Sequence, residues 1–286
     1  MSVLDIDYLA GWRDELLKWA VPRDPGPVEE PEGDGWARVA ARFRNMSRTF
    51  RADQDPFMAR LSPWLGKDVT VLEIGAGAGR LTRPVAERVR KVVAVESSPA
   101  MRAVLAEELA ATGLTNVEII PGFWPAVQVE PVDLVFCSHV LYDVADLGPF
   151  LTAMNDVAHR ACFIYLTIRH PFDSFRDLLQ TFRHWSAPTR PTYLDAAQCL
   201  YQLGILPNAE VAELSTGLSF GSPDEALAFY RERIGMAAGS AGENDLRDYL
   251  AAHGEWRSGR WFPRHQMRKV AILWWAKNHR SAFPNP

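Results

Sequence analysis

The sequence predicts an α/β protein in which helices cover both faces of a parallel β-sheet. Short apolar runs alternate with amphipathic segments of helical length through the centre of the chain, and a glycine-rich turn joins the first run to the first such segment. Strands buried on both faces read as nearly continuous apolar runs. With 286 residues, of which 48% are hydrophobic, the chain is long enough to bury one large core.

The predicted strands are rich in valine, leucine and isoleucine and are separated by helical segments or turns. They are Val69–Ile74, Val92–Glu96, Val117–Ile120, Val132–Ser138, Ala161–Ile168, Ala209–Leu214 and Lys269–Ala276. The predicted helices alternate with them and are Gly79–Arg90, Pro99–Thr112, Leu147–Arg160, Pro223–Ile234 and Asn244–His253. Strands that alternate with helices of this length form parallel βαβ units.

The first 65 residues predict a helical cap on the main domain, which would occupy residues 66–286. The first helix has one apolar stripe, formed by Leu9, Trp12, Leu16 and Trp19. The segment Pro22–Gly35 contains too many helix breakers for regular structure. Residues 1–36 could therefore close over a ligand as a gate, or the first helix could stay packed on the sheet. A longer helical insertion, at about 172–204, could supply an aromatic roof over an acceptor.

Composition excludes several classes of protein. The formal net charge is −4, and a general binder of nucleic acid is usually basic, so we expect no nucleic-acid partner. The three cysteines, Cys137, Cys162 and Cys199, lie far apart and lack metal-binding spacing, which argues against a disulfide framework, a zinc ribbon or an iron–sulfur cluster. No signal peptide or transmembrane run is evident, so we expect a cytoplasmic protein with no membrane partner. The oligomeric state stays open.

A glycine-rich loop follows the first predicted strand and reads Glu73-Ile74-Gly75-Ala76-Gly77-Ala78-Gly79-Arg80. Glycines at a strand-to-helix turn allow a ligand to approach the backbone closely. A dinucleotide-binding loop would have Gly or Ala where Arg80 stands. Glu73 would repel a pyrophosphate and attract an α-amino group. The loop therefore favours a ligand with an amino-acid end over a dinucleotide.

An acidic residue ends the second predicted strand. Glu96 lies 21 residues after Gly75. A carboxylate at this place can accept hydrogen bonds from both hydroxyls of a ribose. Glu96 is therefore predicted to contact a ribose; the other reading is a solvent-exposed charge at the end of a strand.

The E-x-G-x-G-x-G loop, the later acid and the run PVDLVFCSHVLYDV resemble the class I S-adenosylmethionine-dependent methyltransferases. The resemblance implies a Rossmann-like, seven-stranded, mostly parallel sheet whose last strand is antiparallel, with S-adenosylmethionine as cofactor. It implies the following cofactor contacts: Gly75, Ala76 and Gly77 at the methionine end with Glu73 nearby, Glu96 at the ribose, Ser97 and Met101 beside the adenine, and the Ser138 backbone at the methionine portion.

One position departs from the family pattern. An Asp that binds the adenine amino group often follows the third strand, whereas this chain has Phe123, followed by Trp124. Stacking or a backbone contact at these two residues could replace the lost acceptor. Trp124 could equally belong to the core.

The candidate catalytic residues follow the fourth and fifth strands, because ligands of open α/β sheets bind beyond the carboxyl ends of the strands. His139 and His170 are candidate general bases for a hydroxyl acceptor, since imidazole titrates near neutrality. Tyr142 could hydrogen-bond the acceptor or lie near the sulfonium. His139 could instead only support the cofactor, and His170 could belong to a helix-entry loop.

Two subclasses of the family do not fit. Ser138-His139-Val140-Leu141 stands where exocyclic-amine DNA methylases have Asn/Asp-Pro-Pro-aromatic. Ser138 and Arg169 stand where catechol-type enzymes place metal-binding carboxylates, so we expect no metal. We expect O- or N-methylation of a small molecule. The alternatives are a methyltransferase acting on a tRNA or a protein, and a non-catalytic or oxidoreductase Rossmann-like protein.

Overall fold

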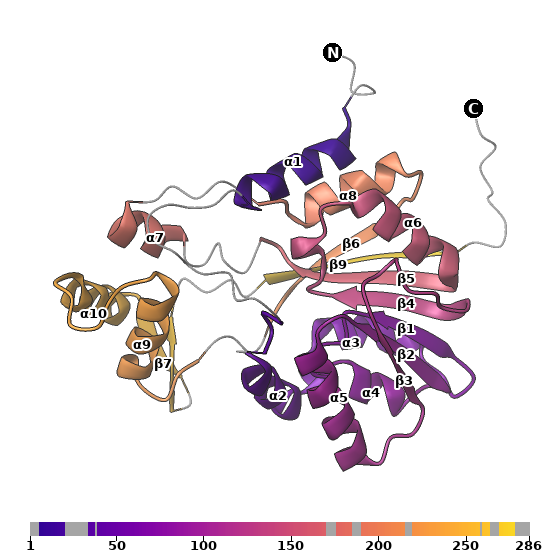
Figure 1. Ribbon diagram of the computed structural model, residues 1–286, viewed down its shortest axis with the longest axis horizontal. Helices are drawn as coiled ribbons and strands as arrows, with labels where there is room; N and C mark the ends of the chain where they lie inside the picture. The colour runs from indigo at the N-terminus through magenta and orange to yellow at the C-terminus, as the bar shows by residue number, and fades with distance from the viewer. Residues whose placement is uncertain are drawn as a thin grey trace.

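A seven-stranded sheet forms the centre of the computed structural model, in the order β3-β2-β1-β4-β5-β9-β6 (Figure 1). Strands β1 to β5 pair in parallel, and β9 runs antiparallel to both β5 and β6. The predicted fold class, including the antiparallel last strand, is therefore confirmed. The structure describes residues 6–20, 34–37, 39–169, 176–184, 190–214, 219–257, 259–263 and 269–277.

The strands lie close to their predicted positions. They are β1 Thr70–Ile74, β2 Lys91–Glu96, β3 Val117–Pro121, β4 Val132–Ser138, β5 Ala158–Thr167, β6 Asn208–Glu213 and β9 Lys269–Ala276. The central strands are buried on both faces, as their apolar runs predict. A separate hairpin consists of β7 Gly254–Arg257 and β8 Arg260–Pro263.

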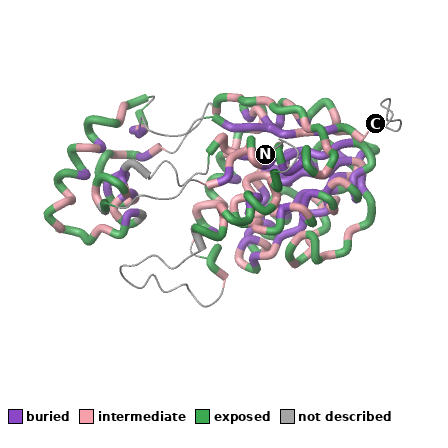
Figure 2. The backbone as a smooth tube through the Cα atoms, turned by 90° about the horizontal axis from the view of Figure 1, so that it is seen from above, coloured by how far each residue is buried: buried purple, intermediate pink, exposed green. Residues whose placement is uncertain are grey.

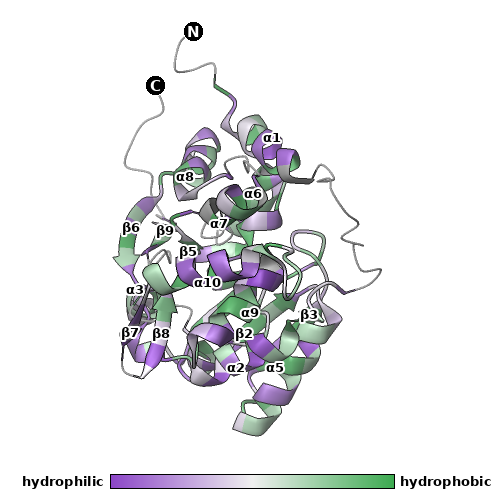
Figure 3. Ribbon diagram, turned by 90° about the vertical axis from the view of Figure 1, so that its left-hand side faces the viewer, coloured by the Kyte–Doolittle hydropathy of each residue, from purple (hydrophilic) through white to green (hydrophobic). Residues whose placement is uncertain are grey.

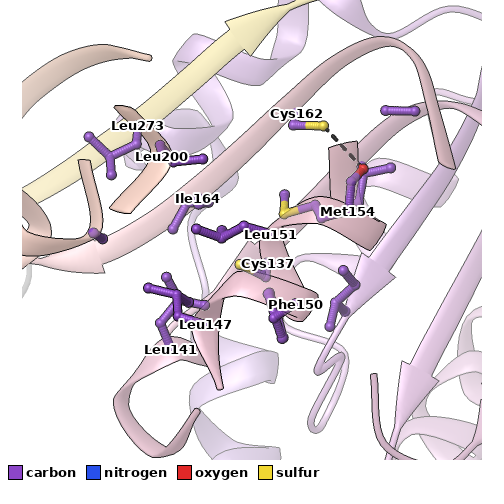
Figure 4. Close-up of a cluster of buried hydrophobic side chains, with 14 of the residues drawn as sticks. Cys137, Leu141, Leu147, Phe150, Leu151, Met154, Cys162, Ile164, Leu200 and Leu273 are labelled. Carbon is purple, nitrogen blue, oxygen red and sulfur yellow. Dashed lines mark hydrogen bonds between the residues drawn. The ribbon is translucent and has the colours of Figure 1, made fainter. Parts of the chain in front are cut away.

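Helices cover both faces of the sheet (Figure 1). One face carries α1 Tyr8–Ala20, α6 Leu147–Val157 and α8 Tyr193–Gln202, and the other carries α2 Ala40–Thr49, α3 Pro56–Leu61, α4 Thr82–Ala86 and α5 Pro99–Thr112. Each face buries its own apolar cluster, and Figure 4 shows α6 side chains against those of β4 and β5 in the first of them. Cys137 and Cys162 lie fully buried there, as small core residues.

The N-terminal residues divide between the two faces of the sheet. Trp12 of α1 is buried against the α6–α8 face, and its indole Nε1 donates to the carbonyl of Val144 at 2.7 Å. Helices α2 and α3 lie on the opposite face, where Asp55 caps α3. Because Leu9, Trp12 and Leu16 of α1 pack against this face, the structure corresponds to the packed arrangement of the first helix. The division of the chain at residue 65 stays a prediction.

A small lobe lies beside the carboxyl ends of the parallel strands (Figures 1 and 2). It comprises α7 Arg176–Arg183, α9 Pro223–Arg233, α10 Gly242–Ala252 and the β7–β8 hairpin. Its separate core includes Leu178, Tyr230 and Trp261. In Figure 3 hydrophobic and hydrophilic residues alternate along α9. The predicted insertion therefore contributes α7 to the lobe and α8 to the sheet. Among the described helices, none has the length and hydrophobicity of a membrane span.

Candidate functional site

The glycine loop between β1 and α4 has an open side at its middle glycine. Gly75, Gly77 and Gly79 all have positive φ, at 73°, 57° and 82°. A Cβ on Gly75 would lie 2.4 Å from Cγ2 of Val140, and one on Gly79 would lie 2.6 Å from Cδ1 of Leu105. A Cβ on Gly77 would meet nothing within 4 Å. The outer glycines therefore permit packing within the protein, whereas Gly77 leaves room for a ligand.

The carboxylate of Glu96 ties this loop to the start of α5. Its Oε2 accepts the Gly77 backbone N–H at 2.7 Å, and its Oε1 accepts the Ser98 N–H at 2.8 Å. Each carboxylate oxygen has a further lone pair, so the group retains acceptor capacity. Glu96 is thus held at the open side of the loop, where the predicted ribose contact requires it.

Glu73 is turned into the protein beneath the loop. Its side chain is buried, and Oε2 accepts a hydrogen bond from Thr82 Oγ1 at 2.6 Å. Burial raises the pKa of Glu73 to about 8, so the carboxyl is protonated at neutral pH. Its predicted contact with the cofactor stays a prediction. The placement favours a structural role beneath Gly75 and Ala76.

The predicted adenine border lies at the start of α5. Met101 is buried there, and Ser97 is half-buried. Asp34 was not singled out in the sequence, where it falls in the segment of helix breakers. Its carboxylate accepts from Ser98 Oγ at 2.7 Å and from the Ala100 N–H at 2.8 Å. The hydrogen bond from the Ala100 N–H lowers the pKa of Asp34, so Asp34 is a charged cap at this helix start.

Phe123 and Trp124 have different environments. Phe123 is 73% exposed, so its ring is available to a ligand. Trp124 packs against the α6–α8 cluster, and its Nε1 donates to the Phe150 carbonyl at 3.1 Å. The structure therefore gives Trp124 a core environment and leaves Phe123 as the candidate for stacking.

Two of the predicted catalytic residues contact one another. Nδ1 of His139 lies 3.0 Å from the Tyr142 hydroxyl, which lies 2.7 Å from Thr167 Oγ1. The Thr167 backbone N–H also donates to the Tyr142 hydroxyl, at 2.7 Å. The third candidate, His170, lies outside the described residues. Strands β4 and β5 thus bring His139 and Tyr142 into one hydrogen-bonded chain.

His139 has an unusual backbone and a neutral ring. Its φ is 60°, and its N–H donates to the Tyr165 carbonyl at 2.8 Å. A positive φ is uncommon for a residue other than glycine. Burial, together with the nearby Arg80 charge, lowers the pKa of His139 to about 3. The imidazole is therefore uncharged throughout the neutral pH range.

A second set of interacting polar side chains, near the carboxyl ends of the parallel strands, was not predicted. Arg80 donates from Nη2 to Ser138 Oγ at 2.8 Å, and its Nη1 lies 3.6 Å from Oδ2 of Asp55. That carboxylate oxygen also accepts from the Tyr165 hydroxyl at 3.2 Å. Arg80 was noticed only as a departure from the dinucleotide motif, and Asp55 carried no sequence signal. Among the described residues, no group of His, Cys, Asp and Glu side chains could hold a metal.

Comparison with known proteins identifies the central part of the chain. Residues 71–160, which contain the glycine loop, Glu96 and the His139–Tyr142 pair, match the family model described as a methyltransferase domain. A protein from Methanosarcina mazei described as a probable ribosomal RNA small subunit methyltransferase A is 50% identical over 87 residues, which cover 30% of each chain. The corresponding Pyrobaculum aerophilum protein is 34% identical over 119 residues, covering 37% of this chain and 50% of the relative. The matches thus span about a third to a half of these relatives.

A solved structure agrees with the fold over most of the chain. It belongs to the complex of the Haloferax volcanii Trm112 methyltransferase activator with a protein provisionally described as a methyltransferase. The TM-score is 0.55 at 13% sequence identity, and the match covers 87% of this chain and 98% of that one. At this identity the likeness concerns the fold.

The relatives overturn the expectation of a small-molecule acceptor and of no nucleic-acid partner. Several of them are described as ribosomal RNA methyltransferases. The expectation rested on a net charge of −4. A net charge sums over the whole surface, and it does not report the charge around one site.

Proposed function

We propose that this chain, a member of the class I S-adenosylmethionine-dependent methyltransferases, transfers the methyl group of S-adenosylmethionine to an RNA. The observation that carries the proposal is the open glycine loop at Gly77 with the Glu96 carboxylate beside it, within the region that matches the methyltransferase domain. The RNA acceptor is supported by the relatives that are described as ribosomal RNA methyltransferases.

The residues at the carboxyl edge of the sheet fit this cofactor. The space at Gly77 would accept close approach of the ligand, and the remaining lone pairs of Glu96 would take the ribose hydroxyls. Ser97, Met101 and the exposed ring of Phe123 would border the adenine. S-Adenosylmethionine supplies an activated methyl group on a sulfonium, so the protein's main task is to align the acceptor and exclude water.

The hydrogen-bond chain from β4 to β5 supports His139 as the general base. The Thr167 hydroxyl donates its only proton to the Arg169 carbonyl, which can only accept. The Tyr142 hydroxyl must then donate to Thr167 Oγ1. No proton remains on Tyr142 for His139, so His139 Nδ1 carries a hydrogen and donates it to the Tyr142 oxygen. This order leaves His139 Nε2 with a free lone pair.

An uncharged Nε2 can accept the proton of an acceptor group such as a hydroxyl of RNA, although the lowered pKa makes His139 a weaker base than an ordinary imidazole. The proton would move from that group to Nε2 as the acceptor oxygen bonds to the methyl carbon; the carbon–sulfur bond would break in the same step, with its electron pair left on the sulfur of S-adenosylhomocysteine. Ser138–Leu141 lacks the Asn/Asp-Pro-Pro-aromatic run of exocyclic-amine DNA methylases, although one relative, 32% identical over 80 residues, is described as an rRNA adenine N-6-methyltransferase. Tyr142 and Thr167 would act as positioning residues.

The test is methyl transfer from tritium-labelled S-adenosylmethionine to deproteinised ribosomal RNA, with nuclease digestion and mass spectrometry of the nucleosides. We expect labelled nucleosides, and a loss of roughly 10²–10⁴-fold in rate for His139→Gln with binding of S-adenosylhomocysteine retained. Label in added proteins alone would contradict the RNA acceptor. A methylated exocyclic amine would contradict the role of His139 as the base.

A further inference from the structure

The guanidinium of Arg80 lies where the ends of β1, β4 and β5 meet. The residue directly follows the glycine loop, and its side chain reaches Ser138 Oγ at the end of β4. Its charge also acts on His139 and on Tyr142. Arg80 therefore stands between the loop that would hold the cofactor and the residues that would meet the acceptor.

Most of the hydrogen-bonding capacity of Arg80 is unused by the protein. A guanidinium has five N–H donors, and the described residues supply one hydrogen-bond acceptor, Ser138 Oγ. The Asp55 carboxylate at 3.6 Å is an ion-pair partner rather than a hydrogen-bond partner. It already accepts the N–H groups of Phe57 and Met58 and the hydroxyl of Tyr165.

The guanidinium also contacts two aromatic rings, and these contacts do not use its N–H donors. It lies over the ring of Phe50, 5.0 Å from the centroid, and over that of Tyr165 at 5.8 Å. The side chain of Arg80 retains 25% exposure, so it is accessible from solvent. An arginine that is stacked, partly exposed and short of acceptors is prepared for a planar anion, because its donor fork matches a carboxylate.

We propose that Arg80 binds the α-carboxylate of the methionine portion of S-adenosylmethionine. The assignment rests on the proposed function, since it takes S-adenosylmethionine as the cofactor. The chemistry fits the site, because the loop residues before Arg80 and the backbone of Ser138 are those expected at the methionine end. The other carboxyl beneath the loop, Glu73, is protonated at neutral pH and engaged by Thr82, so it does not neutralise Arg80.

A purely structural role for Arg80 makes a different prediction. If Arg80 only joined the glycine loop to Ser138, its loss would weaken every ligand of the loop in the same proportion. Binding of a carboxylate makes the effect depend on the ligand. Two ligands that differ only in the carboxylate therefore separate the two roles.

The experiment is calorimetric titration of the full chain with S-adenosylhomocysteine and with its decarboxylated analogue, S-adenosyl-3-thiopropylamine. Wild type, Arg80→Gln and Arg80→Lys are compared with the control Arg90→Gln, whose exposed residue precedes β2 at the opposite edge of the sheet. Thermal unfolding of each variant checks that the fold is retained.

We expect Arg80→Gln to weaken S-adenosylhomocysteine roughly 10- to 100-fold, as for loss of hydrogen bonds to a charged group, while the decarboxylated analogue changes less than about threefold. Arg80→Lys should fall between, because it keeps the charge and loses the fork. Equal weakening of both ligands, or no weakening of either, would overturn the assignment. Failure of the wild type to bind either ligand would instead overturn the proposed function.

Discussion

Substitution of single loop glycines by alanine separates packing from ligand access. An L residue in the left-handed region costs about 1–2 kcal/mol. Gly75→Ala adds an overlap, since its Cβ would lie 2.4 Å from Val140 Cγ2, and overpacking of this kind costs about 1–3 kcal/mol. The expected loss in the free energy of unfolding is therefore ~2–5 kcal/mol for Gly75→Ala and ~1–2 kcal/mol for Gly77→Ala, where no atom lies within 4 Å.

A double-mutant cycle measures the overlap itself. Val140→Ala removes the methyl group that the new Cβ would meet, so we expect a favourable coupling of ~1–3 kcal/mol with Gly75→Ala and none with Gly77→Ala. Urea unfolding of the wild type, of the three single variants and of the two double variants that combine Val140→Ala with Gly75→Ala or Gly77→Ala provides the free energies. A Gly75–Val140 coupling within ~0.5 kcal/mol of zero would refute the packing role of Gly75. In ligand titrations Gly77→Ala should lower affinity for S-adenosylhomocysteine, because its side chain would enter the open side of the loop.

Four further predictions follow from burial and charge. In the unfolded state His139 takes up a proton near its ordinary pKa of 6.5, whereas in the folded state it does so only near pH 3, so the free energy of unfolding falls as the pH drops from 6.5 to 3. His139→Gln should reduce the slope of the unfolding free energy with pH in this range by up to ~1.4 kcal/mol per pH unit. An unchanged slope would contradict the burial of a neutral ring. The pKa of Glu73 is raised in the folded state, so its contribution to the free energy of unfolding is full below about pH 4.5 and is lost as the pH rises toward about 8. Urea unfolding at several pH values should show that Glu73→Gln removes this decline in stability. A decline that persists in Glu73→Gln would show that another group causes it. Trp12→Ala should lower the free energy of unfolding by ~3–5 kcal/mol, because a buried indole and its hydrogen bond to the Val144 carbonyl are lost. A loss below ~1 kcal/mol would mean that α1 is undocked much of the time, as a gate requires. Methyl transfer should persist in EDTA, and activity that needs added magnesium would contradict the expected absence of a metal.

The sheet and the cofactor loop were predictable because their signals are local. An apolar run of four to eight residues indicates a strand, and the loop from Glu73 to Arg80 is one continuous motif. Boundaries were less accurate, since the helix predicted over Gly79–Arg90 is helical only at Thr82–Ala86. The predicted segment begins at Gly79, the last glycine of the loop, whose positive φ interrupts helical geometry.

The contacts among Arg80, Ser138, Asp55 and Tyr165 could not be predicted from the sequence, because these residues are distant in the chain. The hydroxyl of Tyr165 meets Asp55 across 110 positions, and Arg80 reaches Ser138 across 58. Asp34 was missed for a related reason, since its only signal was a breaker-rich segment, while its role depends on the start of α5. The β7–β8 hairpin of the lobe was also not predicted; its paired Trp256 and Trp261 lie in a short, charged run without clear alternation.

The most direct test of the account is calorimetric titration of the wild-type chain with S-adenosylhomocysteine and with NAD. The open loop at Gly77, the adjacent Glu96 and the arginine in place of the third dinucleotide-motif position predict one site for S-adenosylhomocysteine per chain and no detectable heat with NAD. Binding of NAD without binding of S-adenosylhomocysteine would contradict the account.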